Sequence, residues 1–256
     1  MINTAMRTAL LLLIFLFGNA AANSNNVKSK AEFQLPPNFQ STYQVEKYNT
    51  NVGEMHNTLT YRNGSINYYS IAKAKGLAAL FVSAEPTELS ILNWPETAAL
   101  TLPQQQSFNF VQEEEHKRNQ HIEFKLLATG ETLVEGSYKF KPYSLKTNEK
   151  VWSRQLLLLL ISSDFQLNPN ISSNNFFIAD KGHINKFTYT VLGNEAIDYQ
   201  GKTLATVKIK IIKENSKRFS YAWLSKTQFY LPLKIEQYKG EDLNVRMRLT
   251  QLKLNK

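Results

Sequence analysis

The sequence predicts a mainly β protein in which one curved antiparallel sheet forms an incomplete barrel around a single central hydrophobic helix. From Tyr43 onward, short apolar and aromatic segments alternate with turn residues at regular spacing, which is typical of antiparallel folds. Residues 150–165 instead carry a long apolar run without Gly or Pro, which favours a helix. No repeat of about 20 to 50 residues is evident, which argues against a propeller or a solenoid.

Residues 1–22 have the three parts of a secretory signal peptide. Arg7 supplies the positive charge, residues 9–17 form a short apolar run, and Ala20 and Ala22 occupy the small-residue positions before a cleavage site. The apolar run is far shorter than the roughly twenty residues that a membrane-spanning helix needs. We therefore expect cleavage after Ala22 and no integral membrane span in the mature chain.

Composition restricts the compartment and the partners. The chain contains no cysteine, which excludes disulfides and lipidation of a cysteine after the signal. A cysteine-free exported chain fits a bacterial protein, and the periplasm is the simplest compartment.

Cleavage would remove Arg7 and lower the formal net charge from +9 to +8. An exported protein of this charge meets anionic lipids and cell-wall polymers, so we expect no nucleic-acid partner. A solvated basic surface is the simpler explanation of the charge.

After the signal we expect a flexible polar lead-in at residues 23–40 and a single β-rich half-barrel domain at residues 41–254. Asn63-Gly64 predicts a type I′ hairpin turn, and the prolines in residues 84–103 predict a long irregular connection. The strands are expected at residues 41–50, 55–62, 65–73, 77–83, 107–115, 121–128, 132–140, 176–179, 186–194, 203–213, 218–225, 229–238 and 243–252.

The segment expected to form the helix, residues 150–165, is apolar nearly all round in its second half. Such a helix must be covered on most sides, so we expect it in the concave face of the sheet. Periodicity alone leaves a buried strand open as the alternative.

The last third of the chain carries the pattern Phe219, Tyr221, Trp223 and then the segment 230–235, YLPLKI. A Gly-containing turn and an apolar strand follow. This arrangement resembles the closing strands of exported bacterial proteins grouped as domain of unknown function 3108, and the resemblance extends over most of residues 40–252. The chain departs from that family at Ser153-Arg154-Gln155, where an acidic residue is common. The arrangement is also similar to the periplasmic lipoprotein-carrier (Lol-type) half-barrels, which implies a sheet that wraps a helix and leaves an apolar hollow.

Pro232 lies inside one of the expected strands. Proline has no N–H to donate to a strand ladder, so it is confined to an edge strand, to the start of a strand or to a bulge. We therefore interpret Pro232 as a structural residue and expect it at one of these three places.

Groups that could support catalysis are scarce. There is no thiol, no Gly-x-Ser-x-Gly elbow and no phosphate or dinucleotide fingerprint. His116 and His121 lie near the acidic run 113–115, but their spacing is not that of a metal motif, and such a run is usually solvated. The four aspartates lie beside expected turns or helix ends, where capping explains them. We expect a protein that is not an enzyme and has no metal and no cofactor.

Two hypotheses for function remain. The first is a module that binds an apolar small molecule or lipid, such as an acyl chain, in the sheet concavity. Plain core packing is the alternative for each candidate lining residue. The second hypothesis is a cell-envelope structural or protein-interaction module that has a filled core and no ligand. The candidate lining residues are Tyr189, Tyr221, Trp223, Phe229 and Leu233.

Overall fold

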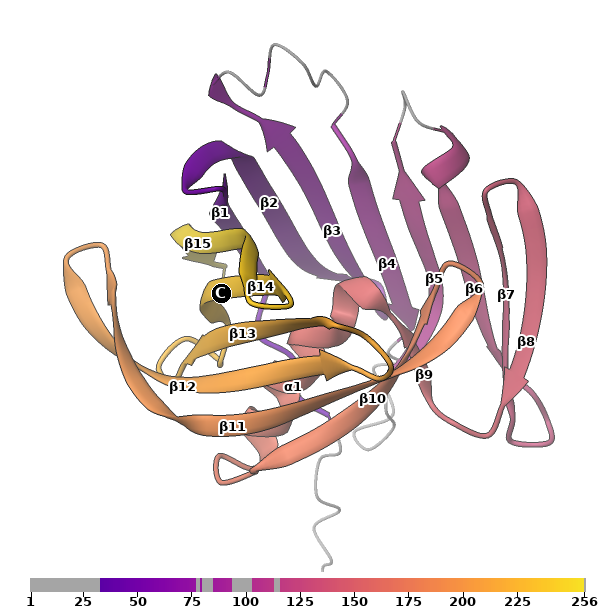
Figure 1. The fold of residues 1–256 in the computed structure, drawn as a ribbon. Helices are drawn as coiled ribbons and strands as arrows, with labels where there is room; N and C mark the ends of the chain where they lie inside the picture. Colours follow the sequence, from indigo (N-terminus) through magenta and orange to yellow (C-terminus); the bar gives the residue numbers. More distant parts are fainter. Residues whose placement is uncertain (1–32, 77–78, 80–84, 94–102, 113–115, 256) are drawn as a thin grey trace, which may run out of the picture. The chain divides into compact units, whose positions relative to one another are not determined.

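The computed structural model describes residues 33–76, 79, 85–93, 103–112 and 116–255. The expected signal peptide, most of the strand expected at 77–83 and the acidic run 113–115 lie outside these residues. The strands (Figure 1) are β1 (Phe39–Lys47), β2 (Thr50–Arg62), β3 (Ser65–Ala74), β4 (Thr87–Asn93), β5 (Gln104–Val111), β6 (Gln120–Leu126), β7 (Thr132–Tyr138), β8 (Lys141–Thr147), β9 (Val151–Ser153), β10 (Ser173–Asp180), β11 (His183–Tyr199), β12 (Lys202–Lys213), β13 (Arg218–Ser225), β14 (Pro232–Lys239) and β15 (Asp242–Leu254). The prediction of a mainly β fold is confirmed.

All of these strands belong to one sheet, in the order β8-β7-β6-β5-β4-β3-β2-β1-β15-β14-β13-β12-β11-β10-β9. We call β1–β8 the N-terminal arm and β9–β15 the C-terminal arm. The arms join where β1 pairs with β15, and Tyr43 lies opposite Leu249 there. The pairs are antiparallel apart from β9 with β10, which is parallel. Within the described residues no pairing joins β8 to β9, so the sheet is open and not a closed barrel.

Besides β9 (Val151–Ser153), two strands form where the sequence did not predict them. β4 lies within residues 84–103, which were expected to be irregular; Pro86 and Pro95 flank this strand and do not interrupt it. β8 follows a turn at Lys139 and Phe140, which adopt positive φ angles of 53° and 62° without any glycine. Proline in an outermost strand costs no ladder hydrogen bond, which explains why Pro142 is tolerated in β8.

The described part of the expected lead-in packs against the core. The ring of Phe33 stacks on that of Trp152, with 5.8 Å between centroids. The backbone N–H of Gln34 donates to Ser163 Oγ at 2.8 Å. β1 then begins at Phe39, two residues before the expected start, and Phe39 is buried. Residues 33–40 are therefore fixed by side-chain contacts, contrary to the expectation of a flexible segment.

The helix begins later than the apolar run suggested. Residues 151–153 form β9, residues Arg154–Leu156 form the 3-10 turn η3, and α1 covers Leu157–Leu167. The prediction of a helix from residue 150 is therefore wrong for its first seven residues. Val151 and Trp152 pair with Phe177 and Ile178 of β10, so the buried-strand alternative applies to this short part.

Helix α1 contributes to hydrophobic clusters that involve both arms. Leu159 and Leu160 belong to a cluster with apolar residues of β1–β4, whereas Ile161 and Phe165 belong to a cluster with β11–β13. The helix is apolar nearly all round because neighbours surround it on more than one side.

Pro232 occupies the first position of β14, which confirms the strand-start expectation. The strand lies between β13 and β15, so it is not an edge of the sheet. Before it, Phe229 and Tyr230 both adopt φ angles of 54° in the turn, and the register with β13 shifts between Trp223 and Leu224. A proline is accommodated here because the ladder is already irregular at this point.

Candidate functional site

Two of the five predicted site residues are buried in the core. Tyr189 packs between Phe165 and Phe176, and its hydroxyl donates to Asp164 Oδ2 at 2.9 Å. Leu233 belongs to a separate cluster with Tyr43 and Leu249. For these two residues the structure shows core packing.

The next two, Tyr221 and Trp223, point away from the helix. Side chains alternate between faces along a strand, and their neighbours Ala222 and Leu224 belong to the cluster that contains Ile161 and Phe165 of α1. Trp223 is nevertheless only 3% exposed.

Charged side chains on that face explain the burial of Trp223. The indole N–H of Trp223 donates to Glu195 Oε2 at 2.5 Å, and Lys234 Nζ lies 3.5 Å from the ring centroid. Lys208 Nζ lies 4.9 Å from the same centroid and 2.7 Å from Glu195 Oε1. Cations over an indole face are attracted by its electron density, so this cluster stabilises the outer face of β12–β14.

Phe229, the fifth predicted site residue, lies in the turn before β14 with an exposed ring, and its carbonyl accepts a hydrogen bond from Ser162 Oγ of α1. The five residues therefore lie on both faces of the sheet and in a turn. They do not line one hollow, and the two pockets described next are lined by other residues.

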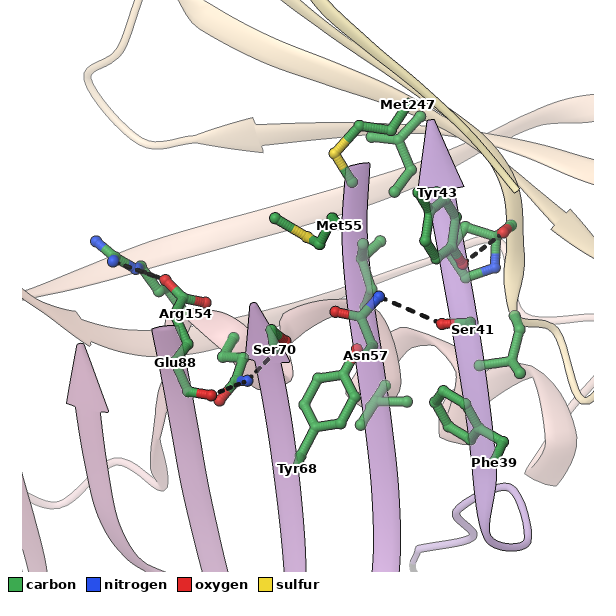
Figure 2. A pocket seen from close by; sticks show the side chains of 16 residues that line it. Phe39, Ser41, Tyr43, Met55, Asn57, Tyr68, Ser70, Glu88, Arg154 and Met247 are labelled. Carbon is green, nitrogen blue, oxygen red and sulfur yellow. Dashed lines mark hydrogen bonds and ion pairs between the residues drawn. The ribbon is translucent and has the colours of Figure 1, made fainter. Parts of the chain in front are cut away.

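A pocket of about 180 Å³ opens over β1–β4 (Figure 2). Its most unusual feature is a polar row across four neighbouring strands, at positions where the pattern of the strands would place apolar residues. The polar row consists of Ser41, Asn57, Ser70 and Glu88, each directly opposite the next. Buried polar groups are costly unless they are hydrogen-bonded, so the row requires partners.

Partners for the polar row come from within the row and from η3. Asn57 Nδ2 donates to Ser41 Oγ at 3.3 Å. Gln155 Nε2 donates to Ser70 Oγ at 2.9 Å and to the carbonyl of Glu88 at 3.2 Å. The Gln155 amide thus links η3 to the N-terminal arm.

Apolar residues flank the polar row on both sides. Phe39 and Tyr68 lie along one side, and Tyr43 and Met55 lie along the other (Figure 2). Burial raises the pKa of both the Tyr43 and the Tyr68 phenols well above the usual range, so both remain neutral donors at physiological pH. Met247 completes this end of the pocket.

Arg154 ties the two arms together through ion pairs. Its Nε and Nη2 donate to Glu88 Oε1 of β4 at 2.9 and 2.7 Å, and its Nη1 donates to Asp180 Oδ1 of β10 at 3.0 Å. Burial alone would lower the pKa of Arg154, but the two carboxylates outweigh it and raise the pKa further. A guanidinium carries five N–H donors in a fixed plane, which lets Arg154 bind Glu88 through two nitrogens and Asp180 through the third.

A second pocket, of about 590 Å³, adjoins the first. The two pockets share Arg154, Gln155, Leu158, Ile235 and Met247, and we call them together the groove. The second pocket extends along the C-terminal arm. Its apolar residues include Leu157, Phe187, Ile211 and Phe219, and its charged residues include Asp180, Lys181, Lys213 and Arg218.

The groove residues were not predicted from the sequence. Ser153-Arg154-Gln155 stood out there only as a departure from a family pattern, although Arg154 and Gln155 connect the arms through hydrogen bonds. A signal was present: Ser41, Asn57 and Ser70 interrupt the apolar positions of alternating strands. Polar residues at core-facing positions indicate either a buried network or a cavity.

The described part of the chain contains no group of three or more His, Cys, Asp or Glu placed to hold a metal ion. The Nδ1 atom of His121 instead lies 2.6 Å from Oδ1 of Asn109. None of its helices has the length and apolar character needed to cross a bilayer.

Comparison with known proteins finds little. No family model and no curated protein matches the chain. The resemblances to the domain of unknown function 3108 family and to the Lol-type half-barrels therefore stay predictions. Among solved structures, the chain is similar to a protein of Bacteroides fragilis described as exported and as having a YmcC-like fold. The identity is 9%, the alignment covers 86% of this chain and 98% of that one, and the TM-score is 0.35.

Proposed function

We propose that the chain is an exported, non-enzymatic protein that binds an apolar ligand, such as a lipid or an acyl chain, in the groove. The observation that carries this proposal is the pair of adjoining pockets, which have apolar walls from both arms. Residues 1–22 have the features of a secretory signal peptide, which supports export of the chain. In a bacterium the expected destination is the periplasm.

The size and the lining of the groove favour an apolar ligand. Ligand pockets are commonly about 300 to 1,000 Å³ and mostly apolar with a few placed polar groups. Leu158, Ile235 and Met247 lie where the two pockets meet. Burial of apolar ligand surface there would contribute about 25 cal/mol per Å². Two methionines, Met55 and Met247, add side chains that adapt to irregular ligands.

The chemistry of the lining favours binding over catalysis. As described, the lining contains neither histidine nor cysteine. Its two carboxylates, Glu88 and Asp180, are both ion-paired with Arg154. Ser41 and Ser70 are the hydroxyl side chains of the polar row, and neither has a neighbouring base of the kind that activates a serine nucleophile. The alternative, an envelope interaction module with a filled core, is disfavoured by the two pockets.

The test uses the neutral fluorescent probe N-phenyl-1-naphthylamine with the mature protein. The parent should bind the probe stoichiometrically, because the groove excludes water from it. A charge placed in the groove, Leu158→Glu, should weaken binding by at least about tenfold, since burying a carboxylate against the probe is unfavourable. The matched control is Leu192→Glu, because Leu192 is 51% exposed and lies outside the groove.

Circular dichroism should show that both variants remain folded. The proposal is wrong if the parent fails to bind the probe, or if Leu158→Glu and Leu192→Glu bind it equally well. Organic extraction and mass spectrometry of protein purified from the periplasm give an independent measurement, in which a stoichiometric lipid is the expected result.

A further inference from the structure

We propose that the groove selects a single-chain amphiphile with an anionic carboxylate head, and that Lys213 and Arg218 hold this head at the end of the groove. This inference rests on the proposed function, because it names the chemical class of the ligand for the same site.

The charges that line the groove do not balance. Two carboxylates, Glu88 and Asp180, line it together with four cations, which leaves a formal net charge of +2. The four cations are Arg154, Lys181, Lys213 and Arg218.

The two carboxylates are already engaged. Arg154 is paired with both of them, and Lys181 Nζ lies 4.0 Å from Asp180 Oδ2. The excess charge therefore lies on Lys213 and Arg218. Within the described residues neither of these two has an ion-pair partner.

Strand register places Lys213 and Arg218 together beside the apolar wall. Lys213 is the last residue of β12, directly opposite Phe187, and it shares a face with Ile211 because side chains two apart point the same way. Arg218 is the first residue of β13, the strand that follows after a short turn. Both cations thus lie at one end of the groove, next to its apolar walls.

The neighbours of Arg218 make an added anion favourable. Arg218 lies directly opposite Lys239 of β14, and like charges in such a pair repel each other. Asp242 lies opposite Lys239 on the far side and offsets part of that repulsion, but it is two strands away from Arg218. A carboxylate between Lys213 and Arg218 would relieve the remaining repulsion.

The chemistry of the two cations fits a carboxylate. A guanidinium binds a carboxylate through two parallel hydrogen bonds, and charge-assisted bonds of this kind are stronger than neutral ones. Beyond these cations the lining includes the apolar side chains of Leu157, Leu158 and Ile235, against which a hydrocarbon chain can pack. A long-chain carboxylate offers an anionic head to the two cations and a hydrocarbon chain to the apolar residues.

The experiment compares laurate, dodecanol and dodecyltrimethylammonium, which share one chain and differ in head-group charge. Each is titrated against the mature protein loaded with N-phenyl-1-naphthylamine. Laurate should displace the probe at about tenfold lower concentration than dodecanol, as expected for one or two charge-assisted hydrogen bonds. Dodecyltrimethylammonium should be the weakest of the three, because the end of the groove is cationic. Added salt should reduce the advantage of laurate.

The variant Lys213→Gln/Arg218→Gln tests the two residues. It should bring laurate to within about twofold of dodecanol and leave dodecanol unchanged, because the apolar walls are intact. The matched control, Lys202→Gln/Lys226→Gln, removes two exposed lysines outside the groove and should keep the preference for laurate.

The outcomes separate this inference from the proposed function. Equal displacement by laurate and dodecanol, or a preference that persists in Lys213→Gln/Arg218→Gln, overturns the inference and leaves apolar binding in place. Displacement by vesicles of phosphatidylglycerol but not by laurate overturns the choice of a single-chain carboxylate. Failure of the parent to bind the probe or any of the three amphiphiles overturns both proposals.

Discussion

The hydroxyl of Tyr43 in β1 donates a hydrogen bond to the backbone carbonyl of Pro232 in β14, with 2.8 Å between the oxygens. The two residues are 189 positions apart in the chain, and the bond is buried. β15 lies between β1 and β14 in the sheet, so this side chain reaches past a neighbouring strand. The contact fastens the beginning of the N-terminal arm to the proline that starts β14.

Replacing Tyr43 by Phe should destabilise the fold by about 1–2 kcal/mol, because it removes this donor from a buried carbonyl. Urea denaturation of parent and variant measures the difference. Tyr48→Phe is the matched control, since Tyr48 is 79% exposed, and it should shift the free energy of unfolding by less than about 0.5 kcal/mol. Equal unfolding midpoints for Tyr43→Phe and the parent would show that the bond contributes nothing.

Arg154→Leu should cost about 2–3 kcal/mol of stability. The variant leaves Glu88 and Asp180 without their shared cation, and their side chains are only 24% and 21% exposed. Loss of one partner from a buried pair typically costs about 3–5 kcal/mol, which partial exposure reduces here. The double variant Glu88→Gln/Arg154→Leu should recover part of the loss, because it removes one of the two unpaired charges. A double variant no more stable than Arg154→Leu would contradict this explanation.

Asp164→Asn should make the protein more stable at neutral pH by about 0.5–1 kcal/mol, because a negative charge in the second half of a helix opposes its dipole. Burial raises the pKa of Asp164, although hydrogen bonds from Asn174 and Tyr189 act in the opposite direction. An acid with a raised pKa in the folded state contributes stability below its unfolded pKa of about 3.9, and this contribution is lost as pH rises through the folded value.

The advantage of Asp164→Asn should therefore shrink as pH falls through the raised folded pKa of Asp164, and it should be lost at about pH 4 and below. Thermal unfolding of parent and variant across this pH range provides the measurement. Asp198→Asn, at an exposed position, controls for the loss of one negative charge. A parent more stable than Asp164→Asn at pH 7 would show that the ionised Asp164 side chain stabilises the fold, contrary to this prediction.

Gly136→Ala should destabilise the N-terminal arm by about 1–3 kcal/mol, the usual range for an overpacked site. A Cβ atom at this position would overlap the carbonyl oxygen of His121 and lie 2.7 Å from the hydroxyl of Tyr143. Urea denaturation should show the loss, whereas the neighbouring Ser137→Ala should stay within about 0.5 kcal/mol of the parent. An unchanged midpoint for Gly136→Ala would mean that β6 and β8 move apart at little cost.

Local sequence signals predicted the hairpins well where the turn chemistry is strong. Asn63 and Gly64 form the two-residue turn between β2 and β3, and both have positive φ angles, 50° and 70°, as the predicted turn type requires. The turn at Lys139 and Phe140 has similar φ angles without the residues that favour them, so β8 was missed. Positive φ in such residues is imposed by the pairing of β7 with β8 and leaves no local signal.

The candidate site could not be predicted from alternation alone. A period of two indicates that Tyr221 and Trp223 share a face, but it does not reveal which face the helix covers. Ala222 and Leu224 belong to the hydrophobic cluster that contains Ile161 and Phe165 of α1, and this membership places the aromatic pair on the opposite side. The same limit applies to the polar row, since Ser41 and Ser70 are 29 positions apart and become neighbours only through β2.

By itself, the sequence determined the β-rich class of this protein, most of its hairpins and the confinement of Pro232 to an edge strand, a strand start or a bulge, because these follow from backbone sterics and neighbouring side chains. The tertiary structure alone decided the late start of α1, the joining of the arms by Arg154 and the position of the groove. Those features depend on which distant surfaces meet, and the free energy of such contacts is set by packing across the whole sheet and not by any short segment.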